Sequence, residues 1–373
     1  MNSESARYNS YNLDHLGLIA GMVDELGLPE LIDTLIKQDH DQRQVSVGVC
    51  VKAMILNGLG FVNRALYLMP QFFKDKPIER LLGKGIEAEH LNDDTLGRAL
   101  DAIYTYDAEK LYSQLAAQSV KRLGLSCQIG HIDSTSFHVD GIYNSDQHEV
   151  EEGVIRITQG YSRDHRPDLN QVILQLISEH LQEGVGFKGK GRPGKDCKPA
   201  IIGYRIEAGV ASVLETRQRK IQQKSGFIIA SNQLDETQLS HETMLDHYTP
   251  GQQKVERGFR FLKDPWFMAN TLFLKSPKRI MALMMIMTLC LLVYGALEYR
   301  IRQKLEQQKQ SFPNQLGKKT EKPTARWVFQ FFTGIHLLVC DNVRSIVLNC
   351  NAYHHQLLNL LGDRYVLLYA NSE

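Results

Sequence analysis

Residues 248–263 read YTPGQQKVERGFRFLK and predict the element on which both the fold and the chemistry of this chain depend. If they form one helix, Glu256 and Lys263 are seven residues apart and lie on the same face, two turns from each other. Upstream, residues 128–137 read QIGHIDSTSF and predict a strand that carries one acid, Asp133, at its end. An acid at a strand end and an acid on a later helix can share a divalent metal ion.

Charge is divided unevenly along the chain. Residues 1–150 contain 13 Lys and Arg against 21 Asp and Glu, whereas the remainder contains 30 against 21. A basic second part is typical of a protein that faces an anion such as DNA, and chance distribution over a solvated surface is the alternative. A chain of 373 residues with 43% hydrophobic and 23% charged residues is long enough for two or three domains, and this composition excludes wholesale disorder.

The cysteines and the apolar segments indicate in which cellular compartment the protein works. Six cysteines form no Cys-x-x-Cys pair and stand mostly in apolar runs, which indicates free thiols and a cytoplasmic protein without a signal peptide. Residues 280–297 form an uncharged run of 18, the length at which a membrane span must be considered. We favour a helix buried nearly all round over a membrane-associated helical protein.

The first 125 residues predict a cluster of amphipathic helices. Apolar residues at helical spacing or in nearly continuous runs occupy three stretches, 16–23, 31–35 and 47–59. Asn92 or Asp93 is expected to cap a helix that runs through Ile103, and Asp107 is expected to cap another that runs through Val120. Helical clusters often bind DNA, but the negative charge makes a packing or dimerisation role at least as good a hypothesis.

From about residue 126 the pattern becomes that of strands. The predicted strands are 128–132, 154–158, 171–177, 201–207 and 227–230. Two polar segments, 187–198 and 309–326, predict loops that either track a phosphate backbone or are solvated connections. The sequence therefore predicts an α+β fold with a helical domain at 1–125, a core at 126–300, and a C-terminal linker and helical segment at 301–373.

Several segments resemble one family. They are NLDHLGLIAGMVDELGLPELID at 12–33, HIDSTSFHVDG at 131–141, GYSRDHRPDLNQVILQL at 160–176, GKGRPGKD at 189–196, FIIASNQLDE at 227–236 and QQKVERGFRFLKDP at 252–265. Together they resemble bacterial insertion-sequence transposases of the DDE, RNase H-like superfamily, in the group with the signature Tyr-x-x-Arg-x-x-x-Glu-x6-Lys. The last segment is the most specific, because its acid, its spacing and its Lys all match.

The resemblance implies an RNase H-like mixed-sheet core that cleaves and joins DNA with Mg2+ or Mn2+. Asp133 and Glu256 would be the first and third metal-binding acids, and Lys263 would contact the DNA end. Further DNA contacts are expected from Gln252, Arg260, Lys188, Lys190 and Arg192. The expected partners are the terminal inverted repeats of the element, target DNA and further copies of this chain, without a membrane.

The chain departs from the family at two places. Gln252 stands where the signature has Arg, and Thr249 stands where it has Tyr, since Tyr248 lies one position early. The middle acid of the family has no matching motif, and the chain looks internally deleted near residues 180–190. The sheet is then expected to lack its fourth strand, leaving Asp133 beside a gap or beside a substitute strand at 201–207.

Other acids and histidines are less suitable as metal ligands. Four acids lie in loops, which hold ligands less firmly than helices and strands do: Asp164, Asp168, Asp196 and Asp235. His131 and His138 bracket Asp133, and a structural role for them is the better hypothesis. Two functions follow for the chain: a DDE transposase impaired by loss of the second acid, or a non-catalytic remnant that binds DNA or dimerises.

Overall fold

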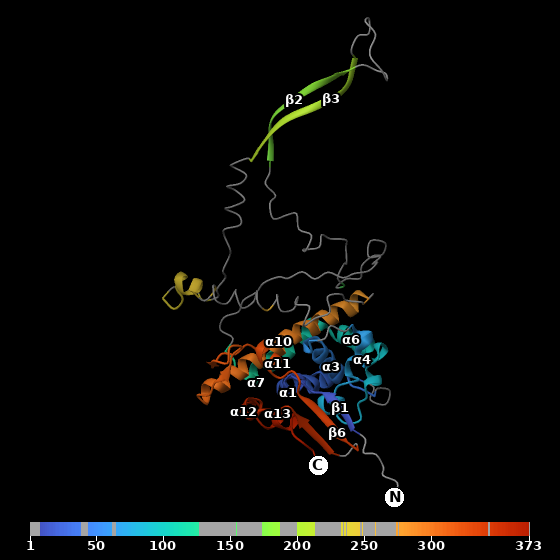
Figure 1. Cartoon of the computed structure of the whole chain (residues 1–373), viewed down its shortest axis with the longest axis vertical. Helices are drawn as coiled ribbons and strands as arrows, with labels where there is room; N and C mark the ends of the chain where they lie inside the picture. The colour runs from blue at the N-terminus through green and yellow to red at the C-terminus, as the bar shows by residue number, and fades with distance from the viewer. Residues whose placement is uncertain are drawn as a thin grey trace. The chain divides into compact units, whose positions relative to one another are not determined.

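The α+β fold predicted from the sequence is confirmed, with N-terminal helices, small antiparallel sheets and C-terminal helices (Figure 1). The computed structural model describes residues 8–38, 44–61, 65–126, 237–246, 276–341 and 344–372, the backbone of 174–186 and 200–212, and single positions at 154, 233, 235, 248, 258 and 274. It divides into two compact units. The first consists of residues 1–158 and 248–373, and the second of residues 159–247.

The N-terminal part of the first unit is helical, as predicted. Its α-helices are α1 (Leu16–Leu26), α2 (Leu28–Leu35), α3 (Val47–Leu59), α4 (Met69–Phe73), α5 (Ile78–Leu82), α6 (Asp93–Tyr106) and α7 (Ala108–Leu123), with short 3-10 turns η2 (Leu66–Leu68) and η3 (Ala88–Leu91). Apolar side chains on these helices converge in one core that also contains residues from the C-terminal part of the chain.

The predicted helix caps are confirmed by hydrogen bonds. Asn92 accepts from the backbone N–H of Thr95 at 2.9 Å and begins α6. Asp107 accepts from the N–H groups of Glu109 and Lys110 and begins α7. These side chains satisfy N–H groups that the first turn of a helix leaves without partners, which explains why both helix starts were visible in the sequence.

Helix α10 (Pro277–Gln307) contains the uncharged run of residues 280–297 and lies in the core of the first unit. It packs against α1, α3, α6 and α7, and also against α11 (Ala325–Phe331) and α12 (Ala352–Leu361). By length and composition alone it could cross a membrane, but 56% of its most apolar window is buried inside the structure. The boundary predicted at residue 300 falls within this helix, which joins N-terminal and C-terminal segments in one core.

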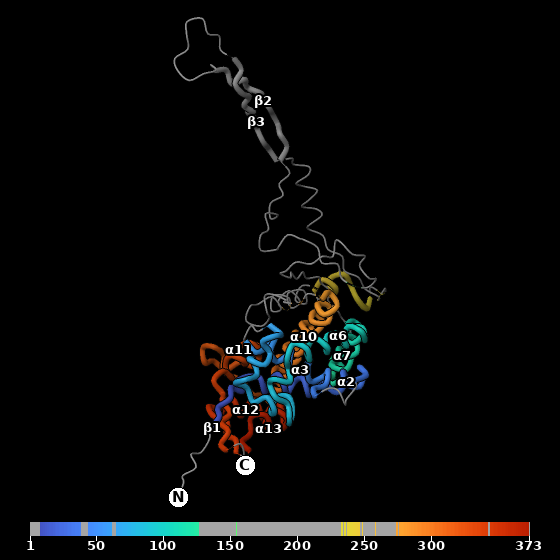
Figure 2. The backbone as a smooth tube through the Cα atoms, turned by 90° about the vertical axis from the view of Figure 1, so that its right-hand side faces the viewer, coloured from blue at the N-terminus to red at the C-terminus, as the bar shows by residue number. Residues whose placement is uncertain are grey.

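A three-stranded antiparallel sheet joins the two ends of the described chain. Strand β1 (Tyr8–Asn12) pairs with β6 (His336–Cys340), and β6 pairs with β7 (Arg344–Leu348). Both views place β1 and the C-terminal helices α12 and α13 (Asp363–Leu368) at the same end of the first unit (Figures 1 and 2). The strand pairing was not predicted, because YNSYN in β1 has no alternation of apolar and polar residues.

The polar linker predicted at 309–326 contains an ordered turn. This segment contains a short antiparallel hairpin of β4 (Phe312–Pro313) and β5 (Lys319–Thr320), followed by the start of α11. The physical reason is a turn closed by the side chain of Asn314, which accepts hydrogen bonds from the N–H groups of Leu316 and Lys318 at 2.9 Å. Polar composition hid an ordered turn.

The second unit contains a long antiparallel pair, β2 (Leu174–Gly186) and β3 (Ala200–Ser212). The register runs from Leu174 opposite Ser212 to Gly186 opposite Ala200. The strands predicted at 171–177 and 201–207 overlap this pair, but β2 continues through residues that lack an apolar pattern. Antiparallel pairing satisfies backbone groups whatever the side chains are, so the paired strands extend beyond the apolar residues that reveal them.

The remaining strand predictions fall largely or wholly outside the described residues. These are 128–132, 154–158 and 227–230. The incomplete RNase H-like core and its missing fourth strand also concern this part of the chain, and both stay predictions. The strand pairs that the structure does describe are all antiparallel.

Candidate functional site

Every residue predicted to act in catalysis or DNA binding lies outside the described residues. This holds for Asp133, Glu256, Lys263, Gln252, Arg260, Lys188, Lys190 and Arg192, and also for Asp164, Asp168 and Asp196. The described part of the chain contains no group of three or more His, Cys, Asp or Glu side chains that could hold a metal ion. The predicted Mg2+ site therefore depends on residues whose geometry is not described.

Asp235, one of the loop acids, is described and has a local role. Its carboxylate accepts from the backbone N–H of Thr237 at 2.9 Å and from the Thr237 hydroxyl at 2.6 Å, and Gln238 also donates to it. These bonds to Thr237 lower the pKa of Asp235 below its usual value. Its hydrogen bonds are those of a turn residue at the start of a short helical segment.

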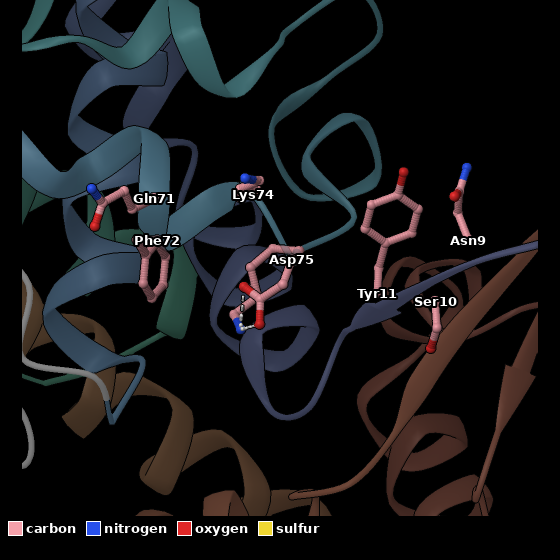
Figure 3. Close-up of a pocket in the computed structure, with 8 residues that line it drawn as sticks. Asn9, Ser10, Tyr11, Gln71, Phe72, Lys74 and Asp75 are labelled. Atoms are coloured by element: carbon pink, nitrogen blue, oxygen red, sulfur yellow. Dashed lines mark hydrogen bonds and ion pairs between the residues drawn. The ribbon is translucent and has the colours of Figure 1, made fainter.

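A groove of about 630 Å3 lies between β1 and the end of α4 (Figure 3). It is lined by Asn9, Ser10, Tyr11, Gln71, Phe72, Lys74, Asp75 and Lys76. In Figure 3 the side chains of Asn9 and Tyr11 project from one side of β1, and Ser10 projects from the other. Strand β1 is the outer strand of its sheet, so the groove follows the edge that does not pair with β6.

The charged groups of the groove largely satisfy one another. The Nζ atom of Lys76 lies 3.1 Å from both carboxylate oxygens of Asp75, although Lys76 itself is only 7% exposed. Asn12 donates to Asp75 twice, from its side chain to the carboxylate at 2.6 Å and from its backbone N–H to the carbonyl at 2.7 Å. The free-energy cost of burying the Lys76 ammonium is small because the Asp75 carboxylate compensates for the lost hydration.

This arrangement suits binding rather than catalysis. Lys74 offers an exposed cation, and the neighbouring amides and hydroxyls offer hydrogen bonds. One carboxylate lines the groove, and it is already engaged by Lys76 and Asn12. Metal-assisted phosphoryl transfer needs several carboxylates that converge on the ions, so this groove is not the site that the sequence predicts.

A second cavity of about 360 Å3 lies beside β7, α12 and the residues after α13. Cys350, His355 and Tyr369 are among the residues that line it. Burial raises the pKa of the Cys350 thiol, and burial raises the pKa of Tyr369 well above its usual value. A neutral thiol is a poor nucleophile, so the raised pKa of Cys350 disfavours nucleophilic chemistry in this cavity.

His15 is the most strongly buried titratable group near the start of α1. Its Nε2 atom lies 2.9 Å from the carbonyl oxygen of Leu59, and its ring stacks on Phe329 with centroids 4.6 Å apart. Its Nδ1 atom has no hydrogen-bond partner among the described residues. Burial lowers the pKa of His15 from 6.5 to about 4, so the imidazole is neutral at pH 7 and serves packing.

Comparison with known proteins bears on the N-terminal part of the chain. Residues 8–117 match the domain of unknown function DUF4277. This domain occurs in transposase-like proteins. The matched segment begins with β1 and ends within α7, so it leaves out α10, which packs against four of its helices.

No curated protein and no solved structure is significantly similar to the chain. The DUF4277 match therefore supports the coarse relation to transposase-like proteins. The finer assignment to DDE transposases rests on the motifs of the sequence.

Proposed function

We propose that the chain is a DNA transposase of the DDE type, impaired by loss of the second acid. The observation that carries the proposal is the match of residues 8–117 to a domain that occurs in transposase-like proteins. It is supported by HIDSTSF around Asp133 and by QQKVERGFRFLK around Glu256, which resemble the first-acid strand and the last-acid helix of that family. The reaction is metal-dependent cleavage and strand transfer at the ends of an insertion sequence.

Asp133 and Glu256 would hold Mg2+ or Mn2+, and Lys263, seven residues after Glu256, would bind the DNA end. Bound there, a pair of divalent ions would supply activation of the attacking oxygen by one ion and stabilisation of the leaving oxygen by the other. Gln252 would donate a hydrogen bond to phosphate without the charge of an arginine. Arg260 and the cations of the 187–198 segment would neutralise further phosphates.

The alternative proposal is a non-catalytic remnant that binds DNA or pairs with an intact transposase through its helical unit. It is favoured by the absence of a family-like middle acid in the sequence. In both proposals the chain works in the cytoplasm as a homo-oligomer, with terminal inverted repeats and target DNA as partners. Recovery of the protein without detergent would agree with the packing of α10 inside the first unit.

Metal-dependent nicking of DNA separates the two proposals. The full chain is incubated with a supercoiled plasmid that carries the ends of the element, with Mg2+, with Mn2+ or with EDTA. The transposase proposal expects slow nicking that EDTA abolishes and that is lost in the combined variant Asp133→Ala, Glu256→Ala. Asp235→Ala is the matched control, because that carboxylate bonds within its own turn, and it should nick at the wild-type rate.

Two outcomes contradict the enzymatic proposal. Nicking that persists in the Asp133→Ala, Glu256→Ala protein would come from a contaminating nuclease. Intact plasmid under every metal condition, together with retained DNA binding, would favour the non-catalytic remnant.

A further inference from the structure

We propose that the β4–β5 hairpin and the adjoining end of α10 form a docking surface for the phosphate backbone of double-stranded DNA. We call this the basic hairpin surface, and it consists of Lys304, Lys309, Leu316, Lys318, Lys319 and Lys322. The inference rests on the proposed function in one respect, that DNA is the partner of the chain. Its residues lie outside the transposase motifs, and most of them belong to the polar segment 309–326, for which the sequence leaves open a phosphate-tracking loop or a solvated connection.

The charge of this segment sets it apart from the N-terminal part of the first unit. Residues 304–326 contain six Lys and Arg against two Asp and Glu, whereas residues 1–150 contain 13 against 21. A polyanion is repelled by the acidic N-terminal helices and attracted to the hairpin. Phosphate neutralisation by such cations supplies most of the affinity that does not depend on sequence.

The lysines of the surface differ from the arginines of α10 in their partners. Arg279 pairs with Asp101 at 2.7 Å, and Arg302 pairs with Glu298 at 2.6 Å. Arg300 donates to Glu25 at 2.7 Å. By contrast, Lys309, Lys318, Lys319 and Lys322 are exposed and form no ion pair within the described ranges. Arg279 and Arg300 connect α10 to the N-terminal helices and Arg302 pairs within α10, whereas the lysines remain available to a partner.

The hairpin is held in one conformation before any partner binds. Phe312 is buried, and its ring lies edge-on to Phe331 with centroids 4.9 Å apart. The indole Nε1 of Trp327 donates to the carbonyl of Pro313 at 2.7 Å. Gly317, with φ of 73°, adopts the left-handed conformation that the tight turn requires. A pre-ordered turn loses little conformational entropy on binding, which raises affinity.

The end of α10 is tied to the same surface. The Nε atom of Arg302 donates to the carbonyl of Pro323 at 3.0 Å, just after the hairpin, and Glu298 accepts from the N–H of Ala325 at 2.8 Å. Lys304 stands near the end of α10 and Lys309 just after it. These hydrogen bonds therefore connect the helix end that carries both lysines to the segment that follows the hairpin. Cations on two connected elements can contact successive phosphates, which a single flexible lysine cannot do.

Leu316 stands in the turn of the hairpin and is 80% exposed. An exposed leucine between an asparagine-closed turn and two lysines has no packing role among the described residues of the first unit. Apolar side chains presented by basic elements contact the sugars and base edges of the minor groove. Leu316 is thus the contact that reaches past the phosphates, and the lysines hold the hairpin on the backbone.

The test measures binding of the full chain to a random-sequence 30-base-pair duplex by fluorescence anisotropy over a range of KCl concentrations. The variant Lys318→Gln, Lys319→Gln, Lys322→Gln removes three cations from the surface. The control Lys37→Gln, Lys84→Gln, Lys121→Gln removes the same charge from exposed positions in the N-terminal part of the first unit. Unchanged thermal unfolding of both proteins shows that folding is intact.

The hairpin variant should lose affinity on the order of 100-fold at 0.1 M salt, and the slope of log K against log salt should fall in magnitude by about 2 to 3. The control should stay within about threefold of wild type. Leu316→Gln should weaken binding by roughly 5- to 10-fold without changing the slope, because it removes an apolar contact and no charge.

Equal losses in the hairpin variant and the control, or no loss in either, would overturn the docking surface. So would binding of the wild-type chain to anionic phospholipid vesicles in place of the duplex. This result can be told apart from failure of the proposed function. If the chain binds the duplex through the hairpin but never nicks DNA, the docking surface stands and the catalytic proposal fails. Retained binding in Asp133→Ala, Glu256→Ala confirms that the two measurements are independent.

Discussion

His15 illustrates how a single side chain couples this fold to pH. The imidazole packs against the rings of Phe61 and Phe329, with centroids 4.4 and 4.6 Å away, and it bonds to the carbonyl of Leu59. Burial among aromatic rings disfavours the charged imidazolium, which is why the pKa falls to about 4. The folded protein therefore resists protonation at a pH where the unfolded chain accepts a proton.

The free energy of unfolding is expected to fall as the pH drops from 6.5 to 4. In this window the unfolded chain binds a proton at His15 and the folded chain does not, so acid favours unfolding by about 3 kcal/mol in total from this residue. Urea denaturation at pH 7, 5.5 and 4.5 measures the effect. His15→Gln should flatten the dependence, because its amide can still donate to Leu59 without titrating.

Burial also lowers the pKa of His354, so both proteins keep some dependence on pH. The comparison is therefore made between wild type and His15→Gln at each pH. Parallel curves over the whole range would show that His15 does not control the acid response.

At the scale of elements, α1 and α13 approach so closely that glycine is required between them. A Cβ atom built on Gly21 would lie 2.7 Å from the ring of Tyr365, and one on Gly17 would lie 2.6 Å from the ring of Tyr369. Both rings are fixed by their hydroxyl groups, Tyr365 to the carboxylate of Glu25 at 2.7 Å and Tyr369 to the carbonyl of Asp14 at 2.6 Å. The rings cannot move aside without breaking these bonds.

Gly21→Ala should therefore lower the free energy of unfolding by about 1 to 3 kcal/mol, although alanine is the better helix former. Gly295→Ala is the matched control in α10, since a Cβ there meets nothing within 4 Å and should raise stability by up to about 1 kcal/mol. Denaturant titration of both variants measures the difference. A stabilised Gly21→Ala protein would mean that α1 and α13 are not in close contact.

The elements differ in how far the sequence predicted them. The start of α7 was predictable to its capping residue, Asp107, and the start of α6 to within one residue, Asn92 or Asp93, because these side chains are local signals of a helix start. Strand β1 was not predictable, because its partner β6 lies far along the chain and no local pattern encodes that pairing. The hairpin after Phe312 was missed because the side-chain bonds of its turn resemble any polar loop in composition.

The candidate site was predictable only as a set of motif positions. Asp133 and Glu256 can be named from their neighbours in the sequence, but the separation of their carboxylates depends on strand order and packing. The residues around each acid encode neither the strand order nor the packing. The opposite holds for Lys76 and Asp75, whose ion pair is visible in the structure and had no motif to announce it.

At the scale of the whole molecule, the first unit is built from two separate parts of the chain. The segment that matches DUF4277 ends within α7, yet α10 covers α1, α3, α6 and α7, and β6 pairs with β1. Folding of the matched segment thus depends on apolar residues contributed after residue 276. The segment that matches the sequence family is therefore shorter than the unit that folds.

Residues 8–126 expressed alone should expose the apolar surface that α10 covers, aggregate, and bind the dye ANS. Co-expression with residues 274–373 should yield a complex that unfolds in one transition and no longer binds the dye. Differential scanning calorimetry and ANS fluorescence measure both properties. A monomeric, cooperatively folded 8–126 fragment would show that the N-terminal helices are complete without α10.

The pairing of Tyr8 with Cys340 also delays completion of the sheet until late in synthesis of the chain. At 5 to 20 residues per second, a ribosome needs roughly 17 to 66 s to make the residues between these two partners. During that time α1 is already in the cell while Tyr365 and Tyr369, the rings that close over its glycines, have not yet been made. The apolar faces of the nascent N-terminal helices therefore stay uncovered for that time, and slower translation should increase their aggregation.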